Sequence, residues 1–119
     1  DVHLQFVAPE ELQMPQQYLA AGDTQHLDLD DVIDGTDVLY VTRVQKERLP
    51  GAIDIDFFYA VTPEHMERAR KDMVLMHPLP RVGEIPPSLD DDPRAAYFRQ
   101  MKYGLYVRMA LLVGMLGGA

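Results

Sequence analysis

The chain has no cysteine, and this absence excludes several kinds of chemistry at once. Disulfide bonds, thiolate zinc sites and cysteine nucleophiles all require a residue that none of the 119 positions supplies. The absence also fits a reducing compartment, and we expect a cytoplasmic protein. No basic and apolar signal segment opens the chain, which instead enters a predicted strand at once. We therefore expect further protein upstream of Asp1.

Positive charge is missing from the first third of the chain. All eleven Lys and Arg residues lie at or beyond Arg43, and the net charge is −8. Such an acidic protein attracts neither nucleic acid nor an anionic membrane, so we expect neither as a partner. Cations gathered at unusual loops of an acidic chain suggest a site for a small anion. For Arg68, Arg70 and Lys71 we favour the simpler alternative of solvated helix surface.

A long uncharged apolar run is also lacking, although the last segment comes close to one. Residues 103–116 predict a helix that is apolar nearly all round except at Arg108. A membrane span needs about 20 apolar residues, whereas this stretch is shorter and carries a central arginine. The better interpretation is a buried helix that packs against a further domain or subunit.

Strand and helix patterns alternate along the chain. The runs at 38–41 and 74–76 are apolar at every position, which is typical of parallel strands buried on both faces. Thr62 is a suitable helix N-cap before Pro63. Further strands are predicted at 2–8 and 25–27, and helices or helical turns at 14–21, 30–33, 63–71 (Met66 and Ala69 inward), 95–101 (with Pro93 at its start) and 103–116. This order predicts an α/β fold, a Rossmann-like three-layer domain with a parallel sheet flanked by helices, ending in a long C-terminal helix.

Polar residues follow one of the buried strands directly. Ligands of such sheets bind at the carboxyl ends of the strands. In an extended backbone, Arg43 and Gln45 point to the same side. A guanidinium offers a planar fork that matches a carboxylate, and an amide adds a donor and an acceptor beside it. The pair predicts a ligand that carries a carboxylate and an amine, and a solvated surface loop is the alternative.

A proline-rich loop follows the other buried strand. Pro78 and Pro80 remove two backbone donors and push His77 and Leu79 toward extended geometry, and either X–Pro bond is a candidate for the cis form. The carbonyls of such a stiff segment can accept hydrogen bonds from an amide NH2 group. The alternative is a rigid turn in which His77 is simply packed. No second metal ligand stands at a suitable spacing from His77, and we expect neither metal nor cofactor.

Three stretches of this chain resemble the catalytic chains of aspartate carbamoyltransferases. They are Thr42-Arg43-Val44-Gln45-Lys46-Glu47-Arg48, Met76-His77-Pro78-Leu79-Pro80-Arg81-Val82-Gly83-Glu84-Ile85 and Asp92-Pro93-Arg94-Ala95-Ala96-Tyr97-Phe98-Arg99-Gln100, together with Tyr106 to Leu112 and the opening Phe6 to Pro9. Their order and spacing agree with the family. The sister enzyme that acts on ornithine typically carries cysteine where Pro78 stands, which favours aspartate here. The resemblance implies that residues 1–119 form a partial aspartate-binding domain, whose N-terminal carbamoyl-phosphate partner is absent and whose helix 103–116 packs on that partner.

The resemblance also implies roles for single residues. Arg43 binds a carboxylate of aspartate and Gln45 helps to place it. Leu79 through its carbonyl, with Pro78 and Pro80 beside it, contacts the carbamoyl group of carbamoyl phosphate. The residues implied in loop and domain closure are Lys46, Glu47, Arg48, Arg81, Glu84 and Arg108.

The implied reaction is carbamoyl transfer from carbamoyl phosphate to the amine of L-aspartate, which yields N-carbamoyl-L-aspartate and phosphate in pyrimidine biosynthesis. It relies on orientation and on cations that stabilise developing charge, with no covalent nucleophile and no metal. Family members are trimers with shared active sites, so a homotrimer is expected. A regulatory chain or fused pyrimidine-pathway domains both stay open.

Two departures from the family pattern qualify this expectation. The phosphate-binding segment of the family belongs to the preceding domain and is absent, so we expect the 119-residue chain to be inactive alone. Residues 49–63 are also shorter than usual, which affects the details of loop closure. A non-catalytic module that keeps the fold for assembly or weak ligand binding is the alternative function.

Overall fold

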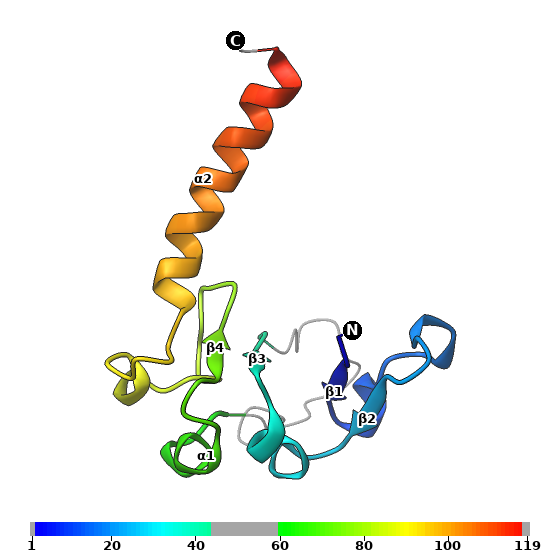
Figure 1. Ribbon diagram of the computed structural model, residues 1–119. Coiled ribbons are helices and arrows are strands. Elements are labelled where there is room, and N and C mark those ends of the chain that lie inside the picture. Colours follow the sequence, from blue (N-terminus) through cyan, green and yellow to red (C-terminus); the bar gives the residue numbers. More distant parts are fainter. Residues whose placement is uncertain (1, 44–59, 118–119) are drawn as a thin grey trace.

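Short strands and two helices make up a computed structural model, which describes residues 2–43 and 60–117 (Figure 1). The strands are β1 (Gln5–Val7), β2 (Thr24–His26), β3 (Val38–Tyr40) and β4 (Val74–Met76), and the α-helices are α1 (Pro63–Arg68) and α2 (Tyr97–Leu116). Single 3-10 turns cover Glu10–Leu12, Gln16–Tyr18, Leu29–Asp31, Ile33–Gly35 and Pro87–Leu89. The predicted strands and the α/β class are confirmed.

The strands associate in parallel pairs. β1 pairs with β2, and β3 pairs with β4 in the register Leu39 opposite Leu75. Ala95 adds an isolated parallel bridge on Leu75. The predicted parallel pairing is confirmed, but the described residues form two two-stranded sheets instead of one sheet. Strands of three residues make few ladder hydrogen bonds. Within the described residues, no such bond connects the β1–β2 pair to the β3–β4 pair.

The hydrophobic core gathers around β4 and the start of α2. Ile33, Leu75 and Tyr97 are fully enclosed, and Leu39 of β3 packs against them. Val38 is 54% exposed and Tyr40 53% exposed. The prediction that strand 38–41 is buried on both faces is therefore wrong for this chain, because the described residues cover only the face that bears Leu39.

Helix α1 begins at the predicted cap. Thr62 Oγ1 accepts the His65 N–H at 3.3 Å, while His65 Nδ1 accepts the Thr62 N–H at 3.0 Å, so each residue satisfies a donor of the other. Met66 and Ala69 are buried as predicted. The helix ends at Arg68, before the predicted end at position 71, because the backbone at Ala69 turns to an extended conformation.

Two arginines, one within α1 and one just after it, pair with carboxylates of the acidic first third of the chain. Arg68 bonds Asp34 Oδ1 through Nε at 3.0 Å and the Asp30 carbonyl at 2.9 Å. Arg70 pairs with Asp37 at 3.2 Å. Both arginine side chains are partly exposed. As expected, both arginines lie at the surface of the fold, where they pair with carboxylates of the same chain.

The predicted helix over 14–21 is reduced to the 3-10 turn Gln16–Tyr18. A tight turn competes with it, in which Asp23 N–H donates to the Ala20 carbonyl and Ala20 N–H donates to Asp23 Oδ2 at 2.8 Å. Gly22 permits this turn through its φ of +100°. No residue of the turn is buried, and a helix this short is unstable unless it packs a face.

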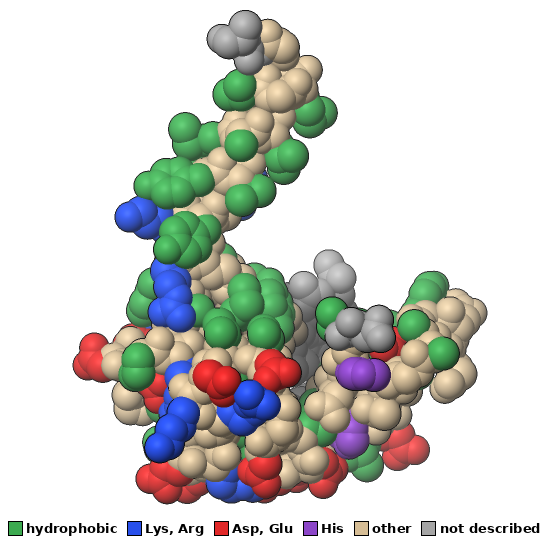
Figure 2. All heavy atoms as spheres, in the orientation of Figure 1, with side chains coloured by type: hydrophobic (Ala, Val, Ile, Leu, Met, Phe, Trp, Pro, Cys, Tyr) green, Lys and Arg blue, Asp and Glu red, His purple; other side chains and the backbone are tan. Residues whose placement is uncertain are grey.

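Helix α2 is continuous, whereas two helices at 95–101 and 103–116 were predicted. It starts at Tyr97, beyond Pro93, because the Arg94 carbonyl and the Ala96 N–H bond the backbone of Leu75 and hold residues 94–96 beside β4, outside the helix. Gly117 ends it with φ of +68°. The helix projects from the rest of the molecule (Figure 1), and apolar side chains cover its visible sides (Figure 2).

In residues 2–43 and 60–117, none of the helices combines the length and apolarity that a membrane crossing requires.

Candidate functional site

The candidate site lies at one edge of the β3–β4 pair. The strands are parallel, Tyr40 is opposite Met76, and Val41 N–H donates to the Met76 carbonyl at 3.0 Å. Arg43 and Leu79 each stand three residues beyond this last paired position, so their loops leave the same edge of the sheet. Arg43 is exposed. The other residues predicted in its loop lie outside the described part of the chain: Gln45, Lys46, Glu47 and Arg48.

The second loop has a tightly defined backbone. The Leu79–Pro80 peptide bond is cis, as the sequence allowed. Leu79 has a φ of 50°, so its predicted extended geometry is wrong. Its N–H turns inward and donates to His77 Nδ1 at 2.9 Å, which accounts for the difference. Pro78 and Pro80 are exposed, whereas Leu79 packs against the core.

His77 is a fully enclosed polar side chain in this loop, with 0% of its surface exposed. Burial disfavours the imidazolium and holds the pKa of His77 below its ordinary value, with Glu84 acting in the opposite direction and Arg81 in the same one. Because Nδ1 accepts a hydrogen bond, the proton of the neutral ring lies on Nε2. Within the described residues Nε2 has no hydrogen-bond partner. His77 is packed, as the alternative interpretation of this loop had it.

Gln100, in the first turns of α2, connects the two strands of the site. Its Oε1 accepts the His77 N–H at 3.0 Å, and its Nε2 lies 3.5 Å from the Tyr40 hydroxyl. Sequence reasoning assigned Gln100 no role. The available signal was its position three residues after Tyr97, which places both on one face of the helix.

Arg81 is held by the carboxylate of Asp90. Its guanidinium forms a two-pronged ion pair with Asp90, with Nη2 and Oδ2 2.7 Å apart, and lies 5.1 Å from the centre of the Tyr97 ring. The guanidinium and then the Tyr97 hydroxyl lower the pKa of Asp90 to about 2. Burial and then the hydrogen bond to Asp90 raise the pKa of Tyr97 to about 12. This cluster therefore stays fully charged on Arg81 and Asp90 across the neutral range.

Glu84 and Arg108 occupy different surroundings. Glu84 accepts the N–H groups of Val82 and Gly83 at 2.7 and 2.9 Å. Burial opposes its ionisation, but the backbone donors outweigh this and hold the pKa of Glu84 below its ordinary value. Arg108 is exposed midway along α2. The part of Arg81, Glu84 and Arg108 in closure stays a prediction.

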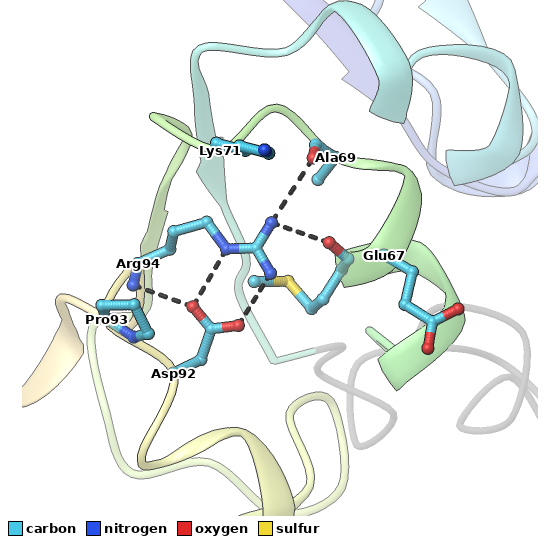
Figure 3. Close-up of a pocket in the computed structure, with 7 residues that line it drawn as sticks. Glu67, Ala69, Lys71, Asp92, Pro93 and Arg94 are labelled. Carbon is cyan, nitrogen blue, oxygen red and sulfur yellow. Dashed lines mark hydrogen bonds and ion pairs between the residues drawn. The ribbon is translucent and has the colours of Figure 1, made fainter.

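A shallow pocket of about 390 Å³ lies away from this edge, between α1 and the turn before α2 (Figure 3). The guanidinium of Arg94 points into it and donates to the carbonyls of Met66 and Ala69 at 2.7 and 3.4 Å. Asp92 holds the same guanidinium with an Nη2–Oδ2 distance of 2.7 Å. Arg94 therefore donates hydrogen bonds to the C-terminal carbonyls of α1, and its role in this pocket is to stabilise the fold.

The comparison with protein families is decisive. A family model described as "Aspartate/ornithine carbamoyltransferase, Asp/Orn binding domain" matches residues 1–115. The chain belongs to this family. Among its relatives, the aspartate carbamoyltransferase catalytic subunit of Thermoplasma volcanium is 46% identical over 98% of this chain. The multifunctional protein CAD of Squalus acanthias is 44% identical over 98% of it. The family resemblance that the sequence motifs predicted is confirmed.

Solved structures of carbamoyltransferases show the same fold. The catalytic subunit of M. jannaschii aspartate transcarbamoylase superposes with a TM-score of 0.85 at 38% identity, covering 100% of this chain and 42% of that one. Aspartate transcarbamoylase from Trypanosoma cruzi in complex with carbamoyl phosphate and aspartate superposes with a TM-score of 0.80 at 40% identity, covering 92% of this chain and 40% of that one.

This carbamoyltransferase domain spans a minor part of the relatives that it matches. It covers 41% of the Thermoplasma volcanium subunit and 6% of the Squalus acanthias protein. Both relatives therefore extend well beyond the region that this chain matches.

Proposed function

We propose that this chain is the aspartate-binding part of an aspartate carbamoyltransferase. The reaction transfers a carbamoyl group from carbamoyl phosphate to the amine of L-aspartate and yields N-carbamoyl-L-aspartate and phosphate. The observation that carries the proposal is that Arg43 and Leu79 follow neighbouring parallel strands at one edge of the sheet. A carboxylate-binding cation and a row of carbonyl acceptors thereby border the same space.

Each side of that space suits one substrate. Arg43 supplies a planar pair of donors for a carboxylate of aspartate, and Gln45 supplies an amide beside it. The Leu79 carbonyl, between Pro78 and Pro80, accepts from the NH2 of the carbamoyl group. Catalysis then follows from holding the aspartate amine against the carbamoyl carbon while phosphate leaves. The Trypanosoma cruzi relative, whose structure contains carbamoyl phosphate and aspartate together, supports this pairing of substrates.

A second part of the protein is needed to hold phosphate and to cover α2. Exposed apolar side chains line this helix, among them Tyr106, Met109 and Leu112, each more than half exposed. We assign the carbamoyl-phosphate domain as the partner that buries residues 103–116, since the relatives extend well beyond the region matched here. Arg108 then lies at the boundary between the domains. Lys46, Glu47, Arg48, Arg81 and Glu84 contribute to loop and domain closure.

The assembly proposed for the whole protein is a cytoplasmic homotrimer with active sites shared between chains. The relation to the multifunctional protein CAD supports fusion to other pyrimidine-pathway domains, and the relation to separate catalytic subunits supports a single-function chain. The length of the full polypeptide decides between these forms.

A reconstitution assay tests the proposal. The 119-residue chain is combined with the carbamoyl-phosphate half of the Thermoplasma volcanium subunit, and labelled carbamoyl aspartate is measured. Product is expected from the pair and from neither half alone. Turnover by the 119-residue chain alone contradicts the assignment of a second domain. Failure of the pair, with both halves folded by circular dichroism, favours a non-catalytic module.

Arg43→Ala in the active pair is the test of the aspartate site. Truncating one partner of a buried charge pair costs about 2–5 kcal/mol, so the KM for aspartate should rise by about 30-fold or more. Arg70→Ala is the matched control, because Arg70 pairs with Asp37 and Asp72 away from this edge and should leave the KM unchanged. Equal KM values for the Arg43 and Arg70 variants would reject the role of Arg43.

A further inference from the structure

We propose that His77 is a positioning residue for carbamoyl transfer, anchored by Gln100, and that it aims the carbonyls of the Pro78–Leu79 segment at the substrate. This inference rests on the proposed function of the site. It adds two residues that touch no substrate themselves but set the direction of the groups that do.

Pro78 and Pro80 make the backbone of this loop unusual, because Leu79 carries the only amide N–H between His77 and Arg81. That N–H donates inward to His77 Nδ1 at 2.9 Å. In a trans peptide the carbonyl points opposite to the N–H of the same unit, and the Pro78–Leu79 bond is trans. The Pro78 carbonyl must therefore point away from His77, toward the open side of the loop.

The same contact anchors Leu79, the residue that bears the next carbonyl. Its N–H is held by His77, and its backbone has a φ of 50°. The loop side chains themselves offer no hydrogen-bonding group here, since residues 78–80 are Pro, Leu and Pro. A single acceptor, the imidazole Nδ1, thus directs the Pro78 carbonyl and anchors the residue that bears the Leu79 carbonyl, and both carbonyls can receive a carbamoyl NH2.

The two ring nitrogens of His77 indicate that this residue does more than fill space. Its ring is enclosed, and Nε2, which must carry the proton when Nδ1 accepts, has no partner within the described residues. An unpaired buried donor is unfavourable, and an apolar side chain would fill the same space without it. The gain that offsets this penalty is the acceptor at Nδ1.

Gln100 connects the backbone of His77 to the strand that precedes Arg43. It accepts the His77 N–H at 3.0 Å from the base of α2, and its amide nitrogen lies 3.5 Å from the hydroxyl of Tyr40. Tyr40 ends the strand that leads to Arg43. One side chain on α2 therefore contacts both strands whose loops hold the substrates.

The test uses the reconstituted pair with two His77 variants. His77→Asn keeps an acceptor near the position of Nδ1, whereas His77→Leu removes it. Misdirection of a reacting group by about 1 Å costs up to about 100-fold, so His77→Leu should lower kcat about 10- to 100-fold, with the KM for aspartate little changed and His77→Asn recovering most of the loss. Nitrogen NMR of the 119-residue chain should show the neutral ring protonated on Nε2.

His65 is the matched control. Its Nδ1 also accepts a backbone N–H, from Thr62 at 3.0 Å, but on α1 and away from this edge. His65→Leu should lower stability and leave kcat unchanged in the folded protein. If His77→Leu fails to fold, Gln100→Glu and Gln100→Leu take its place, since only glutamate retains an acceptor for the His77 N–H.

Three results would overturn the proposal. They are an unchanged kcat for His77→Leu, equal losses in the Asn and Leu variants, and a ring protonated on Nδ1. An active wild-type pair with an unaffected His77→Leu variant would reject this inference alone. No product from a folded wild-type pair would reject the proposed function and this inference with it.

Discussion

At the scale of single residues, Asp90 links the start of α2 to the loop of the candidate site. It holds the guanidinium of Arg81 and accepts the Tyr97 hydroxyl at 2.6 Å. Arg81 directly follows Pro80 in the chain, so this cluster supports the loop at its C-terminal end. The support depends on the ionised carboxylate.

Asp90→Asn should therefore change how stability depends on pH. The pKa of Asp90 is about 2 in the folded chain against an ordinary value of 3.8. A lowered pKa stabilises the folded state fully above about pH 4, and this contribution is lost as the pH falls toward 2. The variant should unfold at lower urea concentration at pH 7 and lose less stability between pH 4 and 2.

Asp91→Asn provides the control for this measurement, since Asp91 is the exposed neighbour on the same turn. It should follow the wild-type curve over the whole range. An acid transition that is identical for wild type and Asp90→Asn would show that the Arg81–Asp90 pair contributes nothing to acid stability.

At the scale of elements, the capping box makes a helix as short as α1 possible. Six residues are too few for a stable isolated helix, so its ends must be satisfied by other groups. Thr62 and His65 serve the N-terminus, and Arg94 serves the C-terminus. The helix is held at both ends by side chains.

Thr62→Ala removes one of these end contacts and should destabilise the chain by about 1 kcal/mol, the usual cost of losing an N-cap hydroxyl. Chemical denaturation followed by circular dichroism measures the difference. Glu67→Ala is an exposed substitution in the same helix and should cost much less. Similar losses in both variants would mean that the cap does not control α1.

The elements that the sequence predicted well are those defined locally. Thr62 and Pro63 mark the start of α1 by their own chemistry, and the apolar runs at 38–41 and 74–76 mark β3 and β4. The helix at 14–21 was predicted wrongly because its pattern is compatible with a helix but no partner surface buries it. The start of α2 was missed because backbone bonds from Leu75, distant in sequence, hold residues 94–96 beside β4 and outside the helix.

The residues of the candidate site also divide into those that the local sequence predicts and those that depend on distant contacts. Arg43 and Leu79 could be predicted as candidates from the sequence because each follows a recognisable strand and carries groups with obvious ligands. Gln100 was missed because its contact with His77 joins residues 23 positions apart, and nothing in the local pattern of a helix reports such a contact. The inward turn of the Leu79 N–H was missed for a related reason, since an acceptor on a side chain two residues away redirected the backbone.

At the scale of the whole molecule, α2 leaves a large apolar surface without cover in the described chain. Leu112 is 58% exposed and Val113 is 55% exposed. Burying one such side chain contributes about 1.5–3 kcal/mol, so Leu112→Gln should weaken association with the carbamoyl-phosphate half by about 10- to 100-fold. Analytical ultracentrifugation of the two halves measures this.

Tyr18→Gln is a suitable comparison, because Tyr18 is also exposed, at 67%, but lies on the turn Gln16–Tyr18 and not on α2. It should leave the association unchanged. If Leu112→Gln binds the other half as tightly as the wild type, the helix has a different partner.

The pairing of Arg68 with Asp30 and Asp34 and of Arg70 with Asp37 has a consequence for how the chain can be divided. The first 42 residues contain no cation of their own apart from histidine and the chain terminus. Separated from α1, they would be a polyanion whose like charges repel, and added salt would be needed to let them contract. Within the described residues, the acidic segment thus acquires counterions when a much later stretch of the same polypeptide folds back upon it.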